Sequence, residues 1–546
     1  MKRKTCFTVK GKPFYSLGIQ THNSSSSTPG YLQYSWNAAK MVEANTVAVP
    51  VSWELFEPQE GNFQESFVTD IIRGARENGL RLILLWFGTW KNGTMEYVPG
   101  WVKKDMLRFP RAQCKDGSRT HNLSPHCKRN LEADKKAFCR LMETVKAFDL
   151  DENTVIGIQI ENEAGLHSAT RRDFSEFGEK AFKEDVPEEL IVYCEANPDS
   201  LPAIEWKKQG AKKSGNWTEL FGVAGGEWVT TWAVATYINE LAKAGKEIYD
   251  IFLYTNAWLN EGRGLAGVDW PSGTPRLNNL DIYYAACTHL DNIAPDIYLQ
   301  EVTSYLDILK AYSHPEKGLP LYVPESSRSV FNSGMMFEGI GDYASIGWHV
   351  FGGESLLTDD QTELEGTEGI SMKHSFHMLR NVVPILPEYT GTDRLHGIHR
   401  RGIEPSALIT GLMGGWRAYV SFEGTIDQFY RMDFLHKEAC REEITGNGGE
   451  PCRGLLFQES ENVFYVVGHK FRIFFLQEED ADGSLSAVMA SAKNCSTNAE
   501  YLSVTEGHFD EEGNYIVDVL RTGDETRHGT YAQWDCNCIR IELVKL

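Results

Sequence analysis

The feature that most constrains the fold is an alternation of short, β-branched apolar runs with longer amphipathic stretches. In 129–148, for example, apolar residues recur at spacings that place them on one helical face. This alternation predicts an α/β protein with a parallel sheet. The candidate strands are FYSLGI (14–19), TVAVPVS (46–52), LILLW (82–86), VIGIQI (155–160), FLYTNA (252–257), IAPDIY (293–298), PLYVP (320–324) and IGWHVF (346–351).

Eight strands fit a (β/α)8 TIM barrel better than the alternative, an open doubly wound sheet. No G-x-G-x-x-G or P-loop pattern follows the first strand, which removes the usual support for a nucleotide-binding fold. Insertions after the third and fourth strands would explain why the span exceeds that of a minimal barrel. We therefore expect residues 1–390 to form a catalytic barrel with a short N-terminal β-hairpin.

The character of the chain changes after the plausible last barrel helix at 367–386. From about residue 400, helical periodicity gives way to alternating or apolar runs separated by Gly, Asn and Asp. This pattern is typical of a β-sandwich. We expect residues 391–546 to form a C-terminal β-sandwich accessory domain.

Composition and charge restrict the partners of this chain. Of its 546 residues, 42% are hydrophobic and 24% are charged, which is typical of a globular protein. The net charge of −22 disfavours nucleic acid and anionic membranes as partners. The 11 cysteines are odd in number and scattered, which indicates reduced thiols, and no secretory or membrane-spanning segment is recognisable. We expect a cytoplasmic protein, although a signal removed beforehand would leave the same pattern; a homo-oligomer is compatible with the sequence.

Two candidate strands end in carboxylates. VIGIQI runs into Glu161 and Glu163, and PLYVP is followed at once by Glu325. The carboxyl ends of barrel strands line one shared mouth. Two carboxylates there are the minimal equipment for glycoside hydrolysis, in which one donates a proton and the other attacks or activates water.

Structural interpretations compete with this hypothesis. A single strand-end glutamate is more often solvated or salt-bridged, and that interpretation is preferred for Glu54, Glu57, Glu161 and Glu354 taken alone. Aromatic residues near the predicted mouth suit the apolar face of a sugar, although each also fits an ordinary core position. These residues are Trp53, Trp86, Trp90, Tyr298 and Trp348.

The segment QIENEAG (159–165) closely resembles the Q-x-E-N-E-x-G segment of family 35 glycoside hydrolases. Further segments resemble strand ends of a bacterial subgroup of that family that finishes in a β-rich domain. These are THNSS (21–25), SWELFEPQEGNF (52–63), LLWFGTWKNG (84–93), IAPDIY (293–298) and VPES (323–326). The resemblance implies a clan-A barrel with Glu163 as acid/base and Glu325 as nucleophile, and Glu161 as a supporting charge.

Three positions depart from the family pattern. Ala164 stands where many relatives have tyrosine, Gln20 replaces an expected acid, and His349 interrupts the eighth strand. The resemblance still implies a retaining, exo-acting enzyme that removes terminal β-linked galactose and needs no cofactor or metal. The alternatives are another clan-A β-glycosidase, such as a β-glucosidase or α-L-arabinopyranosidase, and a non-catalytic carbohydrate-binding protein. The expected substrate-binding residues are His22, Asn23, Trp86, Lys91, Asn92, Asn162, Tyr298 and Trp348.

Two other enzyme classes have weaker support. A structural zinc ion could use Cys114, His121, His126 and Cys127, but their spacing lacks the usual C-x2-C pairs. A serine hydrolase would need a nucleophile elbow, and no G-x-S-x-G occurs.

Overall fold

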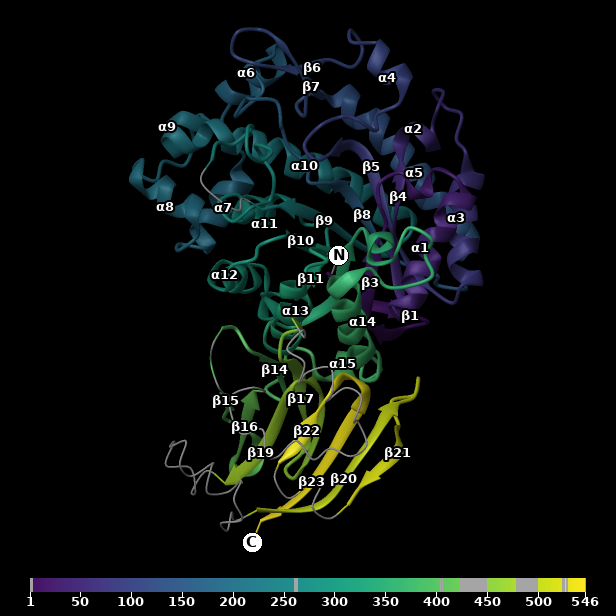
Figure 1. Cartoon of the computed structure of the whole chain (residues 1–546). Coiled ribbons are helices and arrows are strands. Elements are labelled where there is room, and N and C mark those ends of the chain that lie inside the picture. The colour runs from purple at the N-terminus through teal and green to yellow at the C-terminus, as the bar shows by residue number, and fades with distance from the viewer. Residues whose placement is uncertain are drawn as a thin grey trace.

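The computed structural model describes residues 3–259, 264–402, 404, 406–422, 449–477, 499–522, 526 and 529–545. Figure 1 shows a helix-surrounded barrel in its upper part and a β-rich part below it. The N-terminus lies at the barrel, and the C-terminus lies at the far end of the β-rich part. No helix of these described residues is long and apolar enough to cross a membrane.

The barrel sheet confirms the predicted strands. Its strands pair in parallel, and the seventh strand is divided at Pro324, which has no backbone N–H. One half pairs with β13 and the other with β10, so the two halves close the barrel. The strands are β3 (Ser16–Gln20), β4 (Thr46–Ser52), β5 (Arg81–Lys91), β8 (Val155–Asn162), β9 (Phe252–Trp258), β10 (Asn292–Ile297), β11 (Leu321–Val323), β12 (Glu325–Ser326) and β13 (Ser345–Phe351).

Helices cover the outside of this sheet (Figure 1). The stretch 129–148 forms part of a long helix, as its periodicity predicts. Of the predicted stretch 35–44, residues 35–41 belong to a helix that ends at Met41. This helix begins earlier, where the Thr28 side chain accepts a hydrogen bond from the N–H of Tyr31. The barrel helices are α1 (Pro29–Met41), α2 (Trp53–Phe56), α3 (Glu65–Glu77), α4 (Gly100–Lys104), α5 (Lys128–Asp149), α10 (Gly225–Ile248), α11 (Leu280–Ala286), α12 (Val302–Tyr312), α13 (Val330–Asp342), α14 (Gly366–Arg380) and α15 (Leu386–Tyr389).

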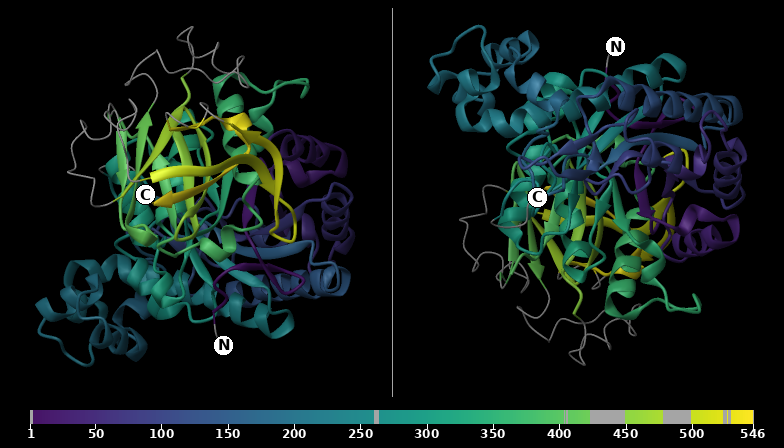
Figure 2. Two further views of the ribbon diagram at one scale, coloured as in Figure 1. Left: turned by 90° about the horizontal axis from the view of Figure 1, so that it is seen from below. Right: turned by 90° about the horizontal axis from the view of Figure 1, so that it is seen from above.

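Insertions follow the third and fourth barrel strands, as expected. After β5 comes a hairpin of β6 (Arg111–Gln113) and β7 (Arg119–Leu123). After β8 come α6 (Glu176–Lys183), α7 (Glu188–Ala196), α8 (Leu201–Lys208) and α9 (Trp217–Phe221), which project to one side in both views of Figure 2. Apolar residues of α7–α9 form a small core of their own against α10 and α11.

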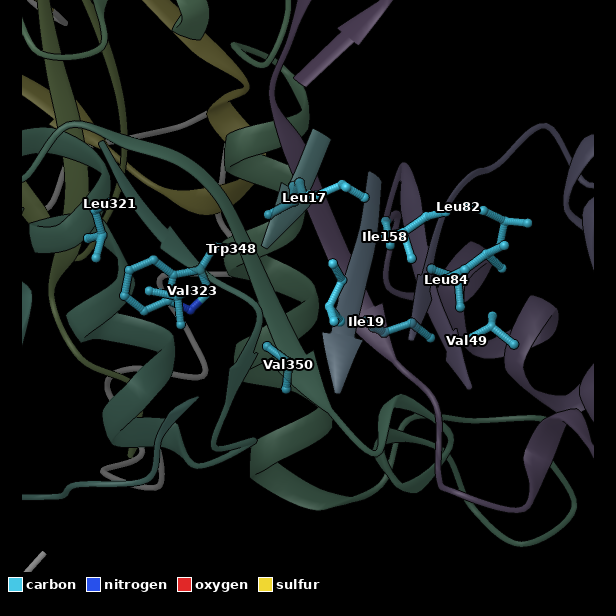
Figure 3. Close-up of a cluster of buried hydrophobic side chains, with 14 of the residues drawn as sticks. Leu17, Ile19, Val49, Leu82, Leu84, Ile158, Leu321, Val323, Trp348 and Val350 are labelled. Atoms are coloured by element: carbon cyan, nitrogen blue, oxygen red, sulfur yellow. The ribbon is translucent and has the colours of Figure 1, made fainter. Parts of the chain in front are cut away.

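Side-chain alternation divides the barrel strands into two apolar sets. One set, which includes Leu17, Leu82 and Trp348, packs toward the surrounding helices (Figure 3). The other set, which includes Ile83 and Tyr322, fills the barrel interior together with Phe7. Phe7 comes from an N-terminal hairpin of β1 (Phe7–Val9) and β2 (Lys12–Phe14). The barrel mouth lies at the carboxyl ends of the strands. Residues that face inward near those ends therefore line the mouth.

The C-terminal part contains two antiparallel sheets around a shared core, as predicted for a β-sandwich. The boundary predicted at residue 390 stays a prediction. One sheet contains β14 (Leu395–His399), β17 (Arg453–Ser460), β18 (Val463–His469), β20 (Ala499–Phe509), β21 (Tyr515–Arg521) and β23 (Cys538–Lys545); the other contains β15 (Ser406–Ile409), β16 (Trp416–Phe422), β19 (Phe471–Gln477) and β22 (Thr530–Ala532).

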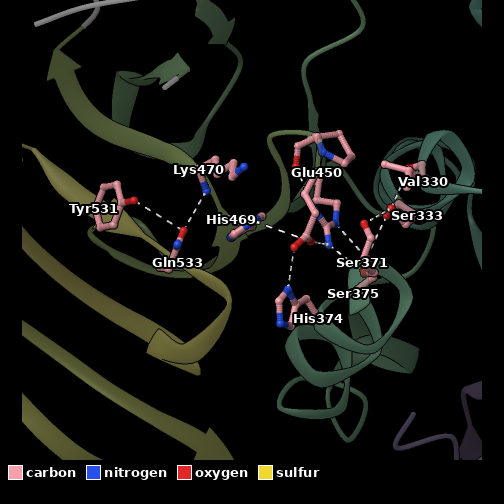
Figure 4. A network of polar contacts seen from close by, with 12 residues as sticks. Val330, Ser333, Ser371, His374, Ser375, Glu450, His469, Lys470, Tyr531 and Gln533 are labelled. Carbon is pink, nitrogen blue, oxygen red and sulfur yellow. Dashed lines mark hydrogen bonds and ion pairs between the residues drawn. The ribbon is translucent and has the colours of Figure 1, made fainter. Parts of the chain in front are cut away.

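A buried polar network joins α14 of the barrel part to β17 of the sandwich (Figure 4). Glu450 accepts hydrogen bonds from His374, at 2.9 Å, and from Arg453, at 2.8 Å. Arg453 also donates to the backbone oxygen of Ser371 and the hydroxyl of Ser375. Burial alone would raise the pKa of Glu450, but the hydrogen bond from His374 and the charge of Arg453 hold it well below its ordinary value. The carboxylate is therefore a charged link between the two parts.

Candidate active site

Three strand-end carboxyl groups meet at the mouth of the barrel. Glu163 follows β8, Asp296 lies on β10 and Glu325 begins β12. One carboxylate oxygen of each lies within 4.8 Å of the other two. Their exposed fractions are 7%, 2% and 6%. The structure thus brings the predicted glutamate pair together and adds a third acid.

Two donors hold Glu325. Gln20, at the end of β3, donates from Nε2 to Glu325 Oε2 at 2.7 Å, and the Tyr298 hydroxyl donates to Oε1. Burial of the Tyr298 side chain raises its pKa most, and the negative charge of Glu325 raises it further. The phenol therefore stays protonated and can donate its hydrogen bond. Hydrogen bonds to a carboxylate favour its ionised form. Glu325 is therefore equipped to act as an anion.

Glu163 is held by its backbone. Its φ of 48° is unusual for a non-glycine residue, and its N–H donates to Asn256 Oδ1 at 2.9 Å. The other end of this amide, Asn256 Nδ2, donates to Asp296 Oδ2 at 2.6 Å. One carboxylate oxygen of Asp296 lies within 4.8 Å of one of Glu163. Burial of Asp296, and next the negative charges of Glu325 and Glu163, raise the pKa of Asp296 well above its ordinary value.

Lys91, Asn92 and Asn162 form a polar group beside these acids. Lys91 Nζ donates to Asn162 Oδ1 at 2.9 Å and also to Asn92 Oδ1. Lys91 is buried, whereas Asn92 is exposed and has a positive φ of 53°. Within the described part of the chain, buried Asn162 Nδ2 has no hydrogen-bond partner. This amide is therefore a donor available to a bound molecule.

His22 and Asn23, two of the predicted sugar-binding residues, lie in the loop after β3. In the structure, His22 contacts other residues of the protein. The His22 ring bonds Ser355 Oγ at 2.7 Å and packs edge-on against Phe351. The His22 N–H donates to Glu354, as do the hydroxyls of two serines in the same region. Glu354 therefore ties loops together, which agrees with its structural interpretation. Asn23 Oδ1 is buried and has no partner among the described residues.

The structure does not bring Trp86 or Trp348 to the carboxyl cluster. Trp86 is fully buried, donates to Asp134 Oδ1 at 2.9 Å and packs against Phe138 of α5. Trp348 is also fully buried and belongs to the apolar cluster of Figure 3. It lies beside Gly339 of α13. Both belong to the set that faces the helices, because alternation turns their strand neighbours inward instead. We leave both out of the proposed site.

Glu161 has a structural position despite its closeness to Glu163. It is fully buried and accepts hydrogen bonds from the N–H groups of Thr89, at 3.2 Å, and Trp90, at 2.7 Å. Burial, and next the charge of Asp134 on α5, raise the pKa of Glu161 well above its ordinary value. Its carboxyl group thus supports the end of β5 that carries Lys91.

Sequence reasoning missed three polar residues of the site. Gln20 was noted only as a departure from a family pattern, and Asn256 and Asp296 were not singled out. Asp296 lies two residues before Tyr298 in the predicted strand 293–298, so alternation would place both on the same face. That spacing could have identified Asp296, but nothing local points to Asn256.

The described residues contain two clusters with enough ligand groups for a metal ion. One is the triad of Glu163, Asp296 and Glu325, and the other is His374, Glu450 and His469. In the second cluster the Arg453 guanidinium already binds the Glu450 carboxylate, which opposes a further cation. The proposed zinc ligands Cys114, His121, His126 and Cys127 form no such cluster among the described residues. The zinc hypothesis therefore has no support.

Residues 32–192 match the family model Glyco_hydro_42, described as Beta-galactosidase. They are part of a glycoside hydrolase barrel. The matched stretch contains Glu163 but ends before Glu325. Residues 372–533 match a second family model, described as a domain of unknown function, DUF5597. No curated protein matches the sequence.

The match corrects one expectation of the sequence analysis. The family indicated is 42, so the assignment by resemblance to family 35 is wrong. Both families belong to clan A, which explains why short strand-end motifs misled. A motif such as QIENEAG covers seven residues at one strand end, which is too little to decide between two families of one clan.

Solved structures with similar folds include two β-galactosidases and a β-amylase. The β-galactosidase from Marinomonas ef1 has a TM-score of 0.46 and 11% identity, and the match covers 69% of this chain and 62% of that one. The enzyme from Halorubrum lacusprofundi has a TM-score of 0.44 and 12% identity, with coverage of 67% and 58%. The catalytic domain of β-amylase from Paenibacillus polymyxa has a TM-score of 0.45 and 12% identity, with coverage of 66% and 97%. This chain thus spans about three fifths of those β-galactosidases, and these matches carry no functional assignment.

Proposed function

We propose that this protein is a retaining, exo-acting β-galactosidase that uses Glu163 as acid/base and Glu325 as nucleophile. The observation that carries the proposal is the closeness of two buried strand-end glutamates, whose carboxylate oxygens lie within 4.8 Å. Retaining glycosidases hold their carboxyl groups about 5–5.5 Å apart, whereas inverting enzymes leave room for a water. The family model description supports β-galactoside as substrate.

In this mechanism the ionised Glu325 attacks the anomeric carbon while Glu163 gives its proton to the leaving oxygen. The glycosidic bond breaks, and an ester bond forms between the sugar and Glu325. Glu163 then acts as base and takes a proton from a water molecule whose oxygen bonds to the anomeric carbon. The ester bond to Glu325 breaks, and the sugar leaves with its original configuration. The donors Gln20 and Tyr298 support the ionised state of Glu325 from which this sequence starts.

The polar groups beside the carboxyl cluster support recognition of a single sugar. Asn162 offers a buried amide donor that Lys91 orients through its oxygen, and Tyr298 lies next to the nucleophile. A buried site that hydrogen-bonds each hydroxyl rejects the wrong epimer, because the mismatch leaves polar groups unpaired at about 1–3 kcal/mol each. His22, Asn23 and Asn92 remain proposed contacts at the rim.

A panel of nitrophenyl glycosides tests the substrate. We expect the β-galactoside to be hydrolysed faster than the β-glucoside, with turnover of the α-L-arabinopyranoside allowed because it lacks only the hydroxymethyl group. A preference for the β-glucoside would assign the barrel to another β-glycosidase activity. Binding of sugars without hydrolysis of any substrate would make the protein a carbohydrate-binding module instead.

Two product analyses test the mode of action. Proton NMR of the first-formed sugar should show the β-anomer, and initial release of the α-anomer would exclude retention. With a galactosylated oligosaccharide, only galactose should appear at early times. Release of disaccharides from within the chain would contradict an exo-acting enzyme.

A further inference from the structure

Trp258, the last residue of β9, is a large aromatic residue that faces the barrel mouth. Before it on the strand, Tyr254 fills the barrel interior, and Asn256 bonds two residues of the acid cluster. Alternation places Trp258 on this same inward face, one step nearer the mouth. Its neighbours Ala257 and Leu259 belong instead to the cluster that faces the helices. Trp258 is partly exposed and, among the described residues, belongs to none of the apolar clusters.

A ring contact holds Trp258 beside the loop that carries Glu163. Its indole packs edge-to-face with His167, with ring centroids 5.1 Å apart and planes at 74°. His167 lies four residues after Glu163, and its Nε2 donates to the backbone oxygen of Val268 at 2.8 Å. β9 also pairs directly with β8, whereas β10 stands between β9 and the strand that carries Glu325. The indole therefore lies on the side of the proposed acid/base.

The turn that borders His167 is apolar on its outer side. Val268 is 50% exposed, and Leu265, whose backbone oxygen accepts from the Val268 N–H at 3.0 Å, is 67% exposed. This rim differs from the group of Lys91 and Asn162, which offers hydrogen bonds. A partly exposed indole with aliphatic neighbours suits a flat apolar surface better than a dense set of hydroxyl groups.

The leaving group of the reaction must extend past Glu163. In the proposed mechanism Glu163 gives its proton to the leaving oxygen, so the group attached to that oxygen lies on the acid/base side, beyond the sugar that Glu325 attacks. We propose that Trp258, supported by His167, binds this leaving group and takes one with a flat apolar face, either an aryl ring or the C–H face of a second sugar. The proposal rests on the proposed function, which makes Glu163 the acid/base.

Transfer of the galactosyl group to added alcohols tests this site. With dinitrophenyl β-galactoside as donor, every acceptor meets the same galactosyl-enzyme. The acceptor oxygen bonds to the anomeric carbon in place of water, its proton passes to Glu163, and the ester bond to Glu325 breaks. The ratio of transfer to hydrolysis therefore reports how well each acceptor occupies the site of the leaving group.

Benzyl alcohol and methanol are the matched acceptors, because only the first carries a ring. Trp258→Ala should lower the ratio of transfer to hydrolysis about tenfold for benzyl alcohol and leave the ratio for methanol at its wild-type value. Trp258→Phe, which keeps an aromatic face, should retain most of the benzyl transfer. Glucose as a third acceptor separates the two sources of the apolar face. A loss for benzyl alcohol alone identifies an aryl site, and a loss for glucose as well shows that a sugar ring also binds there.

Trp232→Ala is the control variant. Trp232 lies on α10 and packs among the helices, so its loss removes an indole from the fold and leaves the mouth unchanged. Its ratios should equal those of the wild type. An unchanged benzyl ratio in Trp258→Ala would overturn the proposal. An equal loss for methanol, or the same loss in Trp232→Ala, would do so too, because it would show general damage to the barrel.

Binding of thioglycosides, whose sulfur link resists hydrolysis, gives a readout that does not need activity. In calorimetry, the wild-type protein should bind phenyl thio-β-galactoside about tenfold more tightly than methyl thio-β-galactoside, and Trp258→Ala should bind the two equally. Equal binding by the wild type refutes the proposal. If the glycoside panel favours glucose, the matching thio-β-glucosides take their place. A protein that hydrolyses no glycoside would contradict the proposed function, while this pair still decides whether Trp258 binds the group beyond the sugar.

Discussion

Replacing Tyr298 by phenylalanine removes one of the two hydrogen bonds to Glu325 and keeps the aromatic ring. The phenol donates to Glu325 Oε1, while Gln20 donates to Oε2 at 2.7 Å. Glu325 is only 6% exposed, so little solvent is at hand to replace the lost donor. The ionised nucleophile should therefore be less favoured in Tyr298→Phe, and the enzyme should lose activity at a higher pH on its acidic side.

The size of this change follows from the kind of hydrogen bond. A bond to a charged group contributes about 1.5–3 kcal/mol. One pH unit corresponds to about 1.4 kcal/mol of preference for one protonation state. The acidic limb of kcat/KM should then rise by about 1–2 units, and nearer the lower figure because Gln20 still donates.

The assay is kcat/KM for nitrophenyl β-galactoside across the pH range of the folded enzyme. Tyr193→Phe is a matched control, because the Tyr193 hydroxyl also bonds a carboxylate, Asp281, at 2.8 Å but lies in the inserted helices. The control should keep the wild-type profile. An unchanged acidic limb in Tyr298→Phe would refute the assignment of Glu325 as the ionised nucleophile.

Three further predictions concern catalysis and stability. Glu163→Gln should slow substrates with poor leaving groups most, and azide should restore turnover of activated substrates; equal losses across leaving groups would contradict its role as acid/base. The folded-state pKa of Glu450 lies below its ordinary value of 4.5, so its stabilising contribution is present above pH 4.5 and is lost as the pH falls through the folded value. Glu450→Gln should therefore lower the melting temperature at pH 7, because it leaves buried Arg453 without its counter-charge. The difference in melting temperature between the variant and the wild type should become smaller in acid. A difference that does not change with pH would contradict this. Gly339→Ala should destabilise by about 1–3 kcal/mol in chemical denaturation, because a Cβ would meet the Trp348 ring at 2.3 Å; Gly226→Ala, with no atom within 4 Å, is the control and should lose nothing.

The strands were predictable because their signal is local. Apolar, β-branched runs such as 46–52 and 155–160 carry their strand preference whatever the rest of the chain does, and both become barrel strands. The division of the seventh strand was not predictable from the run 320–324. Pro324 interrupts the ladder there, and only the closed barrel gives each half its own neighbour.

The site was only half predictable because its members depend on barrel closure. Glu163 and Glu325 stand out in the sequence as carboxylates directly after apolar runs. Gln20 and Asp296 gain their meaning only when β3 and β10 are brought to the same mouth. The opposite error affected Trp86, which ends the predicted run 82–86 but lies inside the longer β5. Alternation along β5 turns its side chain toward a helix, where it packs against Phe138.

The two glutamates that end β8 show how surroundings separate identical side chains. Strict alternation would put Glu161 and Glu163 on the same face, but positive φ values of 61° and 48° interrupt the extended backbone at both. Such backbone strain persists only where contacts on all sides hold it, and it is common at functional sites. Here the N–H groups of Thr89 and Trp90 hold the Glu161 carboxyl group in the protein interior, while Asn256 holds the backbone of Glu163. The strain thus fixes Glu161 as a support and directs Glu163 toward Glu325.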